Sequence, residues 1–237
     1  HLLGRMARQL SADWQTVYSW LLSFEGGVLV DGAYSFRQDA NLEALQFLKG
    51  LYDRNCAWIS LEPAGYAAFA GRRALFLGAD LAEIPAMEAA MTLRSNHDLW
   101  TVIPLPGPEG SAAAAYGPSY AVLESGGEEQ LAAWLFVRWL LSPLNQAEWV
   151  QASGLLPLRG GALSLLEEYR ADHPQWNAAV ESMSRLQGVP QDASWRVVRY
   201  VLEDGAQAIF RMNVPAAQIP DVLAEMDATA ADLTGDE

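Results

Sequence analysis

The stretch YAAFAGRRALFLGAD, residues 66–80, carries the pattern that decides the fold. An alanine-rich helical segment ends at Gly71, and the apolar run Ala74–Leu77 that follows has the length of a short strand. Gly78 then ends the strand, and a glycine at this place lets a ligand approach the backbone closely. The stretch therefore predicts a helix-to-strand unit of an α/β protein, with Asp80 just beyond the strand.

Helical periodicity dominates the chain on both sides of this unit. Amphipathic helices are expected at residues 13–24, 41–54, 128–141, 143–153, 194–212 and 219–233. Gly26 is expected to end the first of these helices in left-handed geometry. Short strands are expected at residues 100–105 and 116–123, on either side of a loop rich in Gly, Pro and Ala. The pattern predicts a helix-rich α/β chain.

Composition limits the classes of partner. The chain has 237 residues, of which 51% are apolar, and its formal net charge is −14. A nucleic-acid surface needs a basic stripe, and none is visible, so no nucleic-acid partner is expected. The single cysteine, Cys56, allows no internal disulfide and no CxxC pair. No apolar run reaches the roughly 18 residues of a membrane span, and residues 1–10 lack a signal-peptide pattern; either the chain is cytoplasmic or its beginning is missing.

A search for catalytic chemistry finds no motif. The three histidines, His1, His97 and His173, are not at metal-ligand spacing from cysteine or carboxylates, so neither a metal site nor a cofactor is expected unless distant residues assemble one. No GxSxG elbow is present. The aromatic content is high, with nine tryptophans and eight tyrosines, several of them near loops or helix starts. An aromatic face offers a sugar ring apolar contact without charge, although most aromatic side chains in any protein belong to its core.

Five segments in this order resemble the latter part of family 1 extracellular solute-binding proteins, the ligand receptors of ATP-driven (ABC) bacterial importers, which include maltose-binding protein. The segments are LLSFEGGVLVDG (21–32), ALQFLKGLYDRN (44–55), YAAFAGRRALFLGAD (66–80), WTVIPLPGPEG (100–110) and the stretch from YGPSY to LLPLR (116–159). The resemblance implies the type II periplasmic-binding-protein-like α/β fold. It also implies a C-terminal fragment that lacks the signal peptide and most of the N-terminal lobe.

The resemblance also implies a division into lobes. Residues 1–116 are expected to form the first part of the C-terminal lobe, and the chain is expected to cross between lobes at Pro104–Gly117. Residues 117–158 are expected to belong to an incomplete N-terminal lobe, and residues 159–237 to return as a helical tail. The implied location is extracytoplasmic, in the periplasm or on the outer face of the cytoplasmic membrane. Membrane association is expected only through a missing N-terminal anchor, as in a lipoprotein.

The implied function is that of a receptor, without catalytic residues, which closes by hinge motion on a carbohydrate and delivers it to the membrane subunits of an ABC importer. Trp195 matches the place of a stacking tryptophan in sugar-binding relatives. If it stacks on ligand, Trp195→Ala should weaken binding by roughly 1–3 kcal/mol and barely change stability. Asp80 stands where many relatives have the aromatic residue of a GxW pattern, which points to a ligand hydroxyl or a cationic group.

Five further residues complete the implied ligand site. Gly117, Ser119 and Tyr120 match an interlobe segment that commonly touches ligand. Trp14 and Tyr18 belong to a helix that can border the cleft, although their helical spacing makes core packing the expected role for at least one of them.

Two other classes of protein share some of these features. A glycoside hydrolase would share the aromatic residues and the acidity, with Asp80 paired with Glu25 or Asp31. A cytoplasmic helical interaction module would share the amphipathic helices but leaves the strand–glycine units unexplained.

The helices at 128–141 and 143–153 carry more apolar side chains than a two-helix hairpin can bury by itself. In the family, the N-terminal lobe covers this hairpin. An exposed apolar patch is therefore expected there, formed by Leu131, Trp134, Leu135, Val137, Trp139, Leu140 and Trp149.

Overall fold

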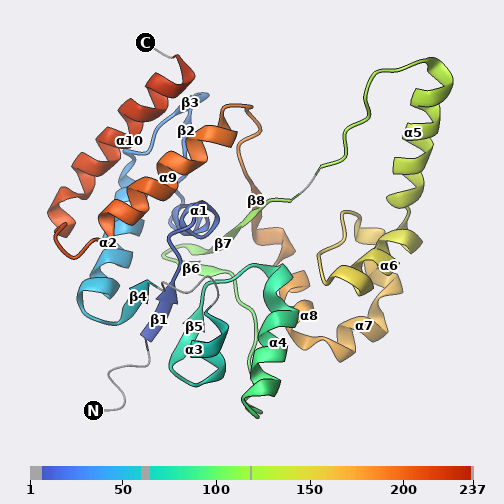
Figure 1. Ribbon diagram of the computed structural model, residues 1–237, viewed down its shortest axis with the longest axis horizontal. Coiled ribbons are helices and arrows are strands. Elements are labelled where there is room, and N and C mark those ends of the chain that lie inside the picture. Colours follow the sequence, from blue (N-terminus) through green and yellow to red (C-terminus); the bar gives the residue numbers. More distant parts are fainter. Residues whose placement is uncertain (1–6, 60–64, 118, 236–237) are drawn as a thin grey trace.

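A computed structural model describes residues 7–59, 65–117 and 119–235 (Figure 1). The helices are α1 Trp14–Ser23, α2 Asp39–Asp53, α3 Tyr66–Ala70, α4 Ile84–Leu93, α5 Gly127–Leu140, α6 Pro143–Ser153, α7 Glu167–Asp172, α8 Pro174–Glu181, α9 Trp195–Ile209 and α10 Ile219–Thr234. The strands are β1 Ala7–Leu10, β2 Leu29–Val30, β3 Ala33–Tyr34, β4 Ala57–Ile59, β5 Ala74–Leu77, β6 Leu105–Gly107, β7 Gly110–Ala115 and β8 Leu186–Gly188. The helix-rich α/β class predicted from the sequence is confirmed.

The strands form three small sheets. In the first, β1 lies between β4 and β5 and pairs with both in parallel, so that α3 leads into a strand as predicted. In another, β7 pairs antiparallel with β6 and parallel with β8, although β8 lies some 70 residues later in the chain. The third is the β2–β3 hairpin. Parallel strands joined through helices are typical of α/β proteins.

The main core forms around α1. Figure 1 shows α1 end-on at the centre of a larger body, with α2, α9 and α10 gathered beside it. Asp13 caps α1 by accepting a hydrogen bond from the Thr16 N–H at 2.8 Å. The largest side chains that this core buries are Trp20, Leu21, Phe36, Leu45, Leu48, Leu202, Ile209, Ile219 and Leu223. In the described part of the chain, no helix is both long enough and apolar enough to cross a membrane.

The end of α1 differs from the prediction. Glu25, not Gly26, adopts the left-handed conformation, with φ 64°, and the Gly26 N–H donates to the Leu21 carbonyl at 2.9 Å. Gly26 is needed for another reason, because a Cβ there would lie 2.1 Å from Oδ1 of Asn41. Asn41 is fully buried and uses this oxygen to accept from the Gly27 N–H. The glycine therefore makes room for a buried amide.

Replacing Gly26 with alanine is expected to lower the free energy of unfolding by about 1–3 kcal/mol, because the added methyl displaces a side chain in a packed site. Gly27→Ala is the matched control, since a Cβ at Gly27 would meet no atom within 4 Å. Urea denaturation of the two variants measures the difference. Equal stability of both would contradict this account of Gly26.

The strands predicted at residues 100–105 and 116–123 are wrong. The β-ladder lies between them, in the segment that the sequence suggested was a loop, because small residues allow this hairpin to approach α1 closely. A Cβ at Gly107 would lie 1.4 Å from the Ser23 carbonyl oxygen, and the Ala114 N–H donates to Ser19 Oγ at 3.0 Å. The chain therefore leaves the larger body only after Ala115, and not from Pro104 as expected.

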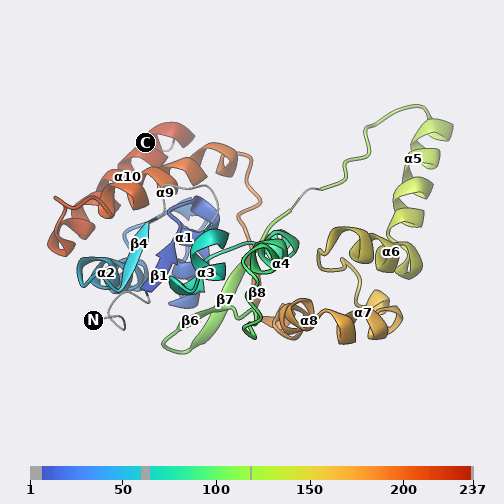
Figure 2. The same cartoon turned by 60° about the horizontal axis from the view of Figure 1, so that its bottom comes forward.

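A smaller body holds α5 to α8 (Figure 2). Its core consists of Ala147, Val150, Leu166 and Trp176, and Trp176 Nε1 donates to the Leu155 carbonyl at 3.3 Å. Leu81 packs against this core from the larger body, in the 3₁₀ helix η2, Leu81–Glu83. The two bodies therefore meet directly beside Asp80.

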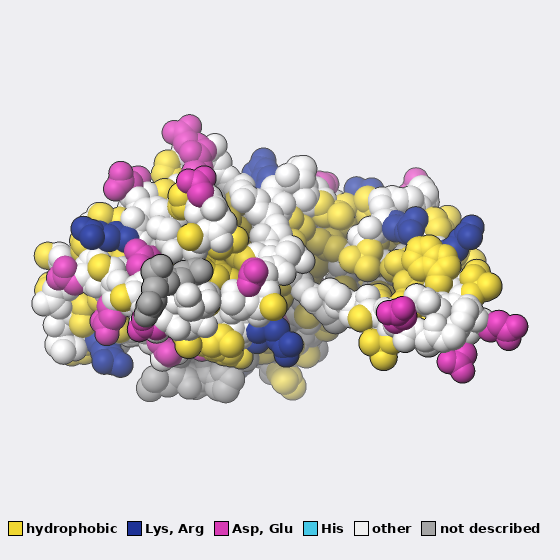
Figure 3. Space-filling view, turned by 90° about the horizontal axis from the view of Figure 1, so that it is seen from above, with side chains coloured by type: hydrophobic (Ala, Val, Ile, Leu, Met, Phe, Trp, Pro, Cys, Tyr) yellow, Lys and Arg dark blue, Asp and Glu magenta, His cyan; other side chains and the backbone are white. Residues whose placement is uncertain are grey.

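The exposed apolar patch predicted on the α5–α6 hairpin is confirmed. No residue of α5 is buried, and large apolar side chains gather at the end of the molecule that carries α5 (Figure 3). The hairpin patch consists of the exposed residues Leu131, Trp134, Leu135, Phe136, Trp139, Leu144 and Trp149, with Val137 and Leu140 partly covered. Such a contiguous patch marks a surface that contacts another apolar surface.

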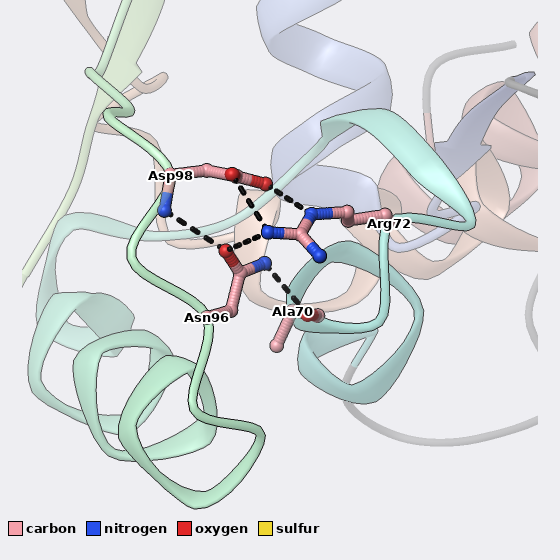
Figure 4. Close-up of polar contacts among 4 residues, drawn as sticks. All are labelled: Ala70, Arg72, Asn96 and Asp98. Atoms are coloured by element: carbon pink, nitrogen blue, oxygen red, sulfur yellow. Dashed lines mark hydrogen bonds and ion pairs between the residues drawn. The ribbon is translucent and has the colours of Figure 1, made fainter.

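The turn between α3 and β5 is held by an ion pair (Figure 4). Arg72 adopts the left-handed conformation, with φ 59°, and its guanidinium donates to both oxygens of Asp98, at 2.6 Å and 2.9 Å. Asn96 joins the network by accepting from Arg72 and donating to the Ala70 carbonyl. The paired guanidinium keeps the pKa of Asp98 below its usual range. The network fastens the helix-to-strand turn to the segment that follows α4.

Candidate functional site

Three of the site residues predicted from the sequence, Trp14, Tyr18 and Trp195, lie together. With Tyr34 and Tyr116 they form the aromatic cluster. Trp195, at the start of α9, meets the ring of Trp14 edge-on and the tilted ring of Tyr18, both at 5.7 Å between centroids. Tyr34 lies almost parallel to Trp195, at 6.3 Å and 15°. Because three rings surround Trp195, it is only 5% exposed and presents no free face to a solute.

Packing between α1 and α9 fixes Trp14 and Tyr18. The backbone N–H of Trp14 donates to Oε2 of Glu203 at 3.3 Å. The guanidinium of Arg199 lies 5.3 Å from the centroid of the Trp14 ring. The Tyr18 hydroxyl donates to the Gly188 carbonyl at 3.4 Å. Both side chains are more than nine-tenths buried. Trp14 and Tyr18 therefore lie behind the surface of the site and support it.

Tyr116 is the most exposed member of the cluster, and it was not among the site residues predicted from the sequence. It follows β7 directly, its ring lies 5.4 Å from that of Trp14, and it is 40% exposed. Its hydroxyl lies close to the Asp80 carboxylate. Burial, and then this carboxylate, raises the pKa of Tyr116 above its ordinary value. Its place immediately before Gly117, in the segment singled out from the sequence, was the signal that could have identified it.

Asp80 is the N-cap residue of η2. The residue as a whole is exposed, but its carboxylate is partly buried. Its N–H donates to Oε2 of Glu83 at 2.8 Å in a capping box. Burial raises the pKa of Asp80, as do the charges of Glu83 and Asp13, while the Tyr116 hydroxyl lowers it. We refer to Asp13, Asp80 and Glu83 as the acidic corner. Its carboxylates can accept hydrogen bonds from hydroxyl groups beside the exposed ring of Tyr116.

Glu83 is held in place by a tyrosine. Its Oε1 accepts a hydrogen bond from the Tyr66 hydroxyl of α3. Burial, followed by the contact with Glu83, raises the pKa of Tyr66 to about 12. The helix-to-strand unit of residues 66–80 thus supplies Tyr66 at its start and Asp80 at its end.

The raised pKa of Asp80 predicts a pH-dependent effect of Asp80→Asn. Protonated Asp80 favours the folded state below its unfolded pKa of about 3.9, and this contribution is lost as the pH rises through the folded pKa. At pH 7 the variant should therefore melt higher than the wild-type protein, and the difference in Tm should vanish towards about pH 3.5. Differential scanning calorimetry measures this difference in Tm. Asp204→Asn, at an exposed position, is the control. A pH-independent difference would contradict the assignment.

The remaining predicted residues lie on the exposed segment between β7 and α5. A Cβ at Gly117 would meet no atom within 4 Å, and Ser119 and Tyr120 are exposed. Within the described residues, no ring contact or hydrogen bond joins Ser119 or Tyr120 to the aromatic cluster. The structure thus places the three beside the site, along the segment that leads from Tyr116 to the smaller body, and does not bring them into it.

The carboxylates nominated for glycoside hydrolysis are far apart. Asp80 lies beside Asp13 at the start of α1, whereas Glu25 follows its end, ten helical residues later. Ten residues span about 15 Å of helix, more than the roughly 5–10 Å that separate a catalytic carboxylate pair. Asp31 lies further along, in the turn of the β2–β3 hairpin. Among the described residues, no group of three or more His, Cys, Asp or Glu side chains could hold a metal ion.

A pocket of about 250 Å³ lies elsewhere, beside the Arg72–Asp98 ion pair. Phe69, Leu75, Met91, Leu99 and Trp100 form most of its apolar wall. None of the site residues predicted from the sequence lines it.

Comparisons with known proteins agree with this fold. Residues 6–183 match a family described as bacterial extracellular solute-binding protein. No curated protein matches the sequence.

Solved structures of solute-binding proteins share the fold at low sequence identity. The sugar-binding protein MalE from Xanthomonas citri is 20% identical with a TM-score of 0.83, and 98% of this chain aligns with 59% of that protein. The cyclic α-maltosyl-1,6-maltose binding protein from Arthrobacter globiformis is 18% identical with a TM-score of 0.79 (98% and 60% covered). UgpB from Mycobacterium tuberculosis, solved with glycerophosphocholine, is 16% identical with a TM-score of 0.71 (98% and 59% covered). The chain thus spans about three fifths of the length of these proteins.

Proposed function

The chain belongs to the family of bacterial extracellular solute-binding proteins, and we propose that it forms one wall of the carbohydrate site in a receptor for an ABC importer. The observation that carries this proposal is the acidic corner beside the exposed ring of Tyr116, which packs against the buried ring of Trp14. Sugars present hydroxyl groups and apolar ring faces, which carboxylate oxygens and aromatic rings bind respectively. The similar structures of a sugar-binding protein and of a cyclic α-maltosyl-1,6-maltose binding protein support the carbohydrate class.

The position of this wall favours a site between two bodies. Leu81, next to Asp80, packs against the core of the smaller body, and Tyr116 lies where the chain leaves the larger body. A solute that touches both bodies stabilises the arrangement in which they are close, so that binding favours closure. In this proposal the exposed segment with Gly117, Ser119 and Tyr120 borders the solute.

The hairpin patch fits the same proposal. The α5–α6 hairpin belongs to the N-terminal lobe, and the patch packs against the sheet of that lobe, while residues 1–116 and the tail with α9 and α10 form the C-terminal lobe. The boundary between the lobes lies later than Leu158 in this proposal, since the core of the smaller body joins Val150 of α6 with Trp176 of α8. The receptor acts outside the cytoplasm, passes its solute to the importer's membrane subunits and carries out no catalysis.

A thermal-shift screen of neutral oligosaccharides, polyols and amino sugars tests the proposal. At a solute concentration 100 times the Kd, binding adds about 2.7 kcal/mol to the stability of the protein, which is readily detected as a rise in Tm. Asp80→Ala is the matched variant, and we expect it to abolish most of the shift. Turnover of a chromogenic glycoside would favour the hydrolase alternative, and an unchanged shift in Asp80→Ala would remove Asp80 from the site.

A further inference from the structure

The β2–β3 hairpin presents a tyrosine to the start of α9. Its two-residue turn consists of Asp31 and Gly32, with φ values of 52° and 87°, which is the geometry of a type I′ turn and suits the twist of a tight hairpin. Tyr34, at the end of β3, then lies beside Ser194 and Trp195, some 160 residues later in the chain. The proposed function gives this tyrosine no role.

Tyr34 makes two contacts with adjacent residues of α9. Its hydroxyl is hydrogen-bonded to Oγ of Ser194, the N-cap residue of α9, at 3.0 Å. Its ring stacks on Trp195, the first residue of that helix, at 6.3 Å and 15°. Asp192 completes the arrangement by accepting hydrogen bonds from both the N–H and the hydroxyl of Ser194. Together these contacts fix both the first turn of α9 and the orientation of its tryptophan.

The hairpin is itself anchored on the side away from the turn. Asp227 of α10 accepts hydrogen bonds from the backbone N–H groups of Phe36 and Arg37, two and three residues after Tyr34. The Ser35 N–H donates to the Val28 carbonyl at 3.0 Å, which closes the hairpin. Tyr34 is therefore presented by a short, braced element and not by a free loop.

A continuous series of ring contacts leads from Tyr34 to the acidic corner. Tyr34 contacts Trp195, Trp195 contacts Trp14, and Trp14 contacts Tyr116, at centroid distances of 6.3, 5.7 and 5.4 Å. The Tyr116 hydroxyl lies close to the Asp80 carboxylate. We propose that Tyr34 is a positioning residue of the solute site, which orients Trp195 and through it Trp14 and the exposed Tyr116 ring next to Asp80. This inference rests on the proposed function.

Fluorine NMR of protein labelled with 5-fluorotryptophan tests the positioning without a ligand. Trp195→Phe and Trp14→Phe assign the two resonances. In Tyr34→Leu we expect both to shift and the Trp195 resonance to broaden or split, because the ring loses its stacking partner. In Tyr34→Phe the Trp195 resonance should stay single. Ser194→Ala also removes the hydroxyl bond to Asp192, so its shift should be at least that of Tyr34→Phe, and adding Tyr34→Phe to Ser194→Ala should produce no further shift.

The control is Tyr52→Leu, which removes another partly buried tyrosine whose ring contacts Phe210 at 5.8 Å. It should leave the Trp195 and Trp14 resonances in place. Unchanged resonances in Tyr34→Leu would overturn the proposal. If Tyr34→Leu does not fold, a further shift when Tyr34→Phe is added to Ser194→Ala would overturn it, because Ser194→Ala has already removed the hydrogen bond of the Tyr34 hydroxyl.

Titration with maltotriose provides the second readout. We expect Tyr34→Leu to weaken binding about tenfold, Tyr34→Phe by less than threefold, and Tyr52→Leu not at all. Wild-type affinity in Tyr34→Leu would overturn the proposal, whereas failure of the wild-type protein to bind maltotriose would contradict the proposed function for this sugar. The NMR measurement decides the positioning role in either case.

Discussion

Trp195→Ala is expected to lower the free energy of unfolding by about 3–5 kcal/mol, a larger loss than that expected for Gly26→Ala. The side chain is 95% buried and contacts three aromatic rings, so its removal leaves a cavity where α1, α9 and the β2–β3 hairpin meet. The resemblance by itself predicted a loss of binding with little loss of stability. The burial of Trp195 changes that expectation, and both stability and binding should fall.

Urea denaturation measures this loss, and Trp134→Ala is the matched control. Trp134 is 55% exposed on the hairpin patch, so the same truncation there should cost less than about 1 kcal/mol. Trp195→Phe, which keeps a ring at the same place, should recover much of the stability. A loss at Trp195 no greater than that at Trp134 would show that the aromatic cluster contributes little to the fold.

The second large effect concerns the hairpin patch. The wild-type chain should bind a hydrophobic dye and self-associate, because several half-exposed apolar side chains lie together on α5 and α6. Replacing both Trp134 and Trp139 with lysine should reduce dye fluorescence several-fold and keep the chain monomeric in analytical ultracentrifugation. The Tm should change little, since neither side chain lies in a core.

Leu93→Lys and Leu99→Lys together are the control for this experiment. Both leucines are almost fully exposed but lie outside the hairpin patch, so their replacement changes net charge equally without removing the patch. Dye binding that falls as much in the control as in the Trp134 and Trp139 variant would show that the hairpin is not the apolar surface that associates.

Helices were predictable from the sequence where their apolar periodicity is local. The face of α1 that carries Trp14 and Leu21 is buried, and α6 ends at Ser153, as expected. The strand β7 was missed because its alanines carry no apolar alternation. They are small in order to pack against α1, and a contact between distant segments leaves no local pattern.

The site was predictable only in part, for the same reason. The sequence identified Trp14, Tyr18 and Trp195, but the three rings that bury Trp195 come from segments some 160 to 180 residues away. Likewise, the pKa of Asp80 is raised partly by Asp13, which lies close only in the folded chain. Residue type and family position suggested these side chains, whereas their exposure and partners depend on tertiary packing.

Amide hydrogen exchange, with and without saturating maltotriose, tests most directly whether a solute binds at the acidic corner between the two bodies. We predict slower exchange with the sugar in peptides that cover residues 12–20, 79–83 and 115–121, because the solute covers these segments and holds the bodies together. Peptides from α10 should exchange at the same rate in both conditions. Protection confined to the pocket beside Arg72, or no protection with any neutral oligosaccharide tested, would contradict the account.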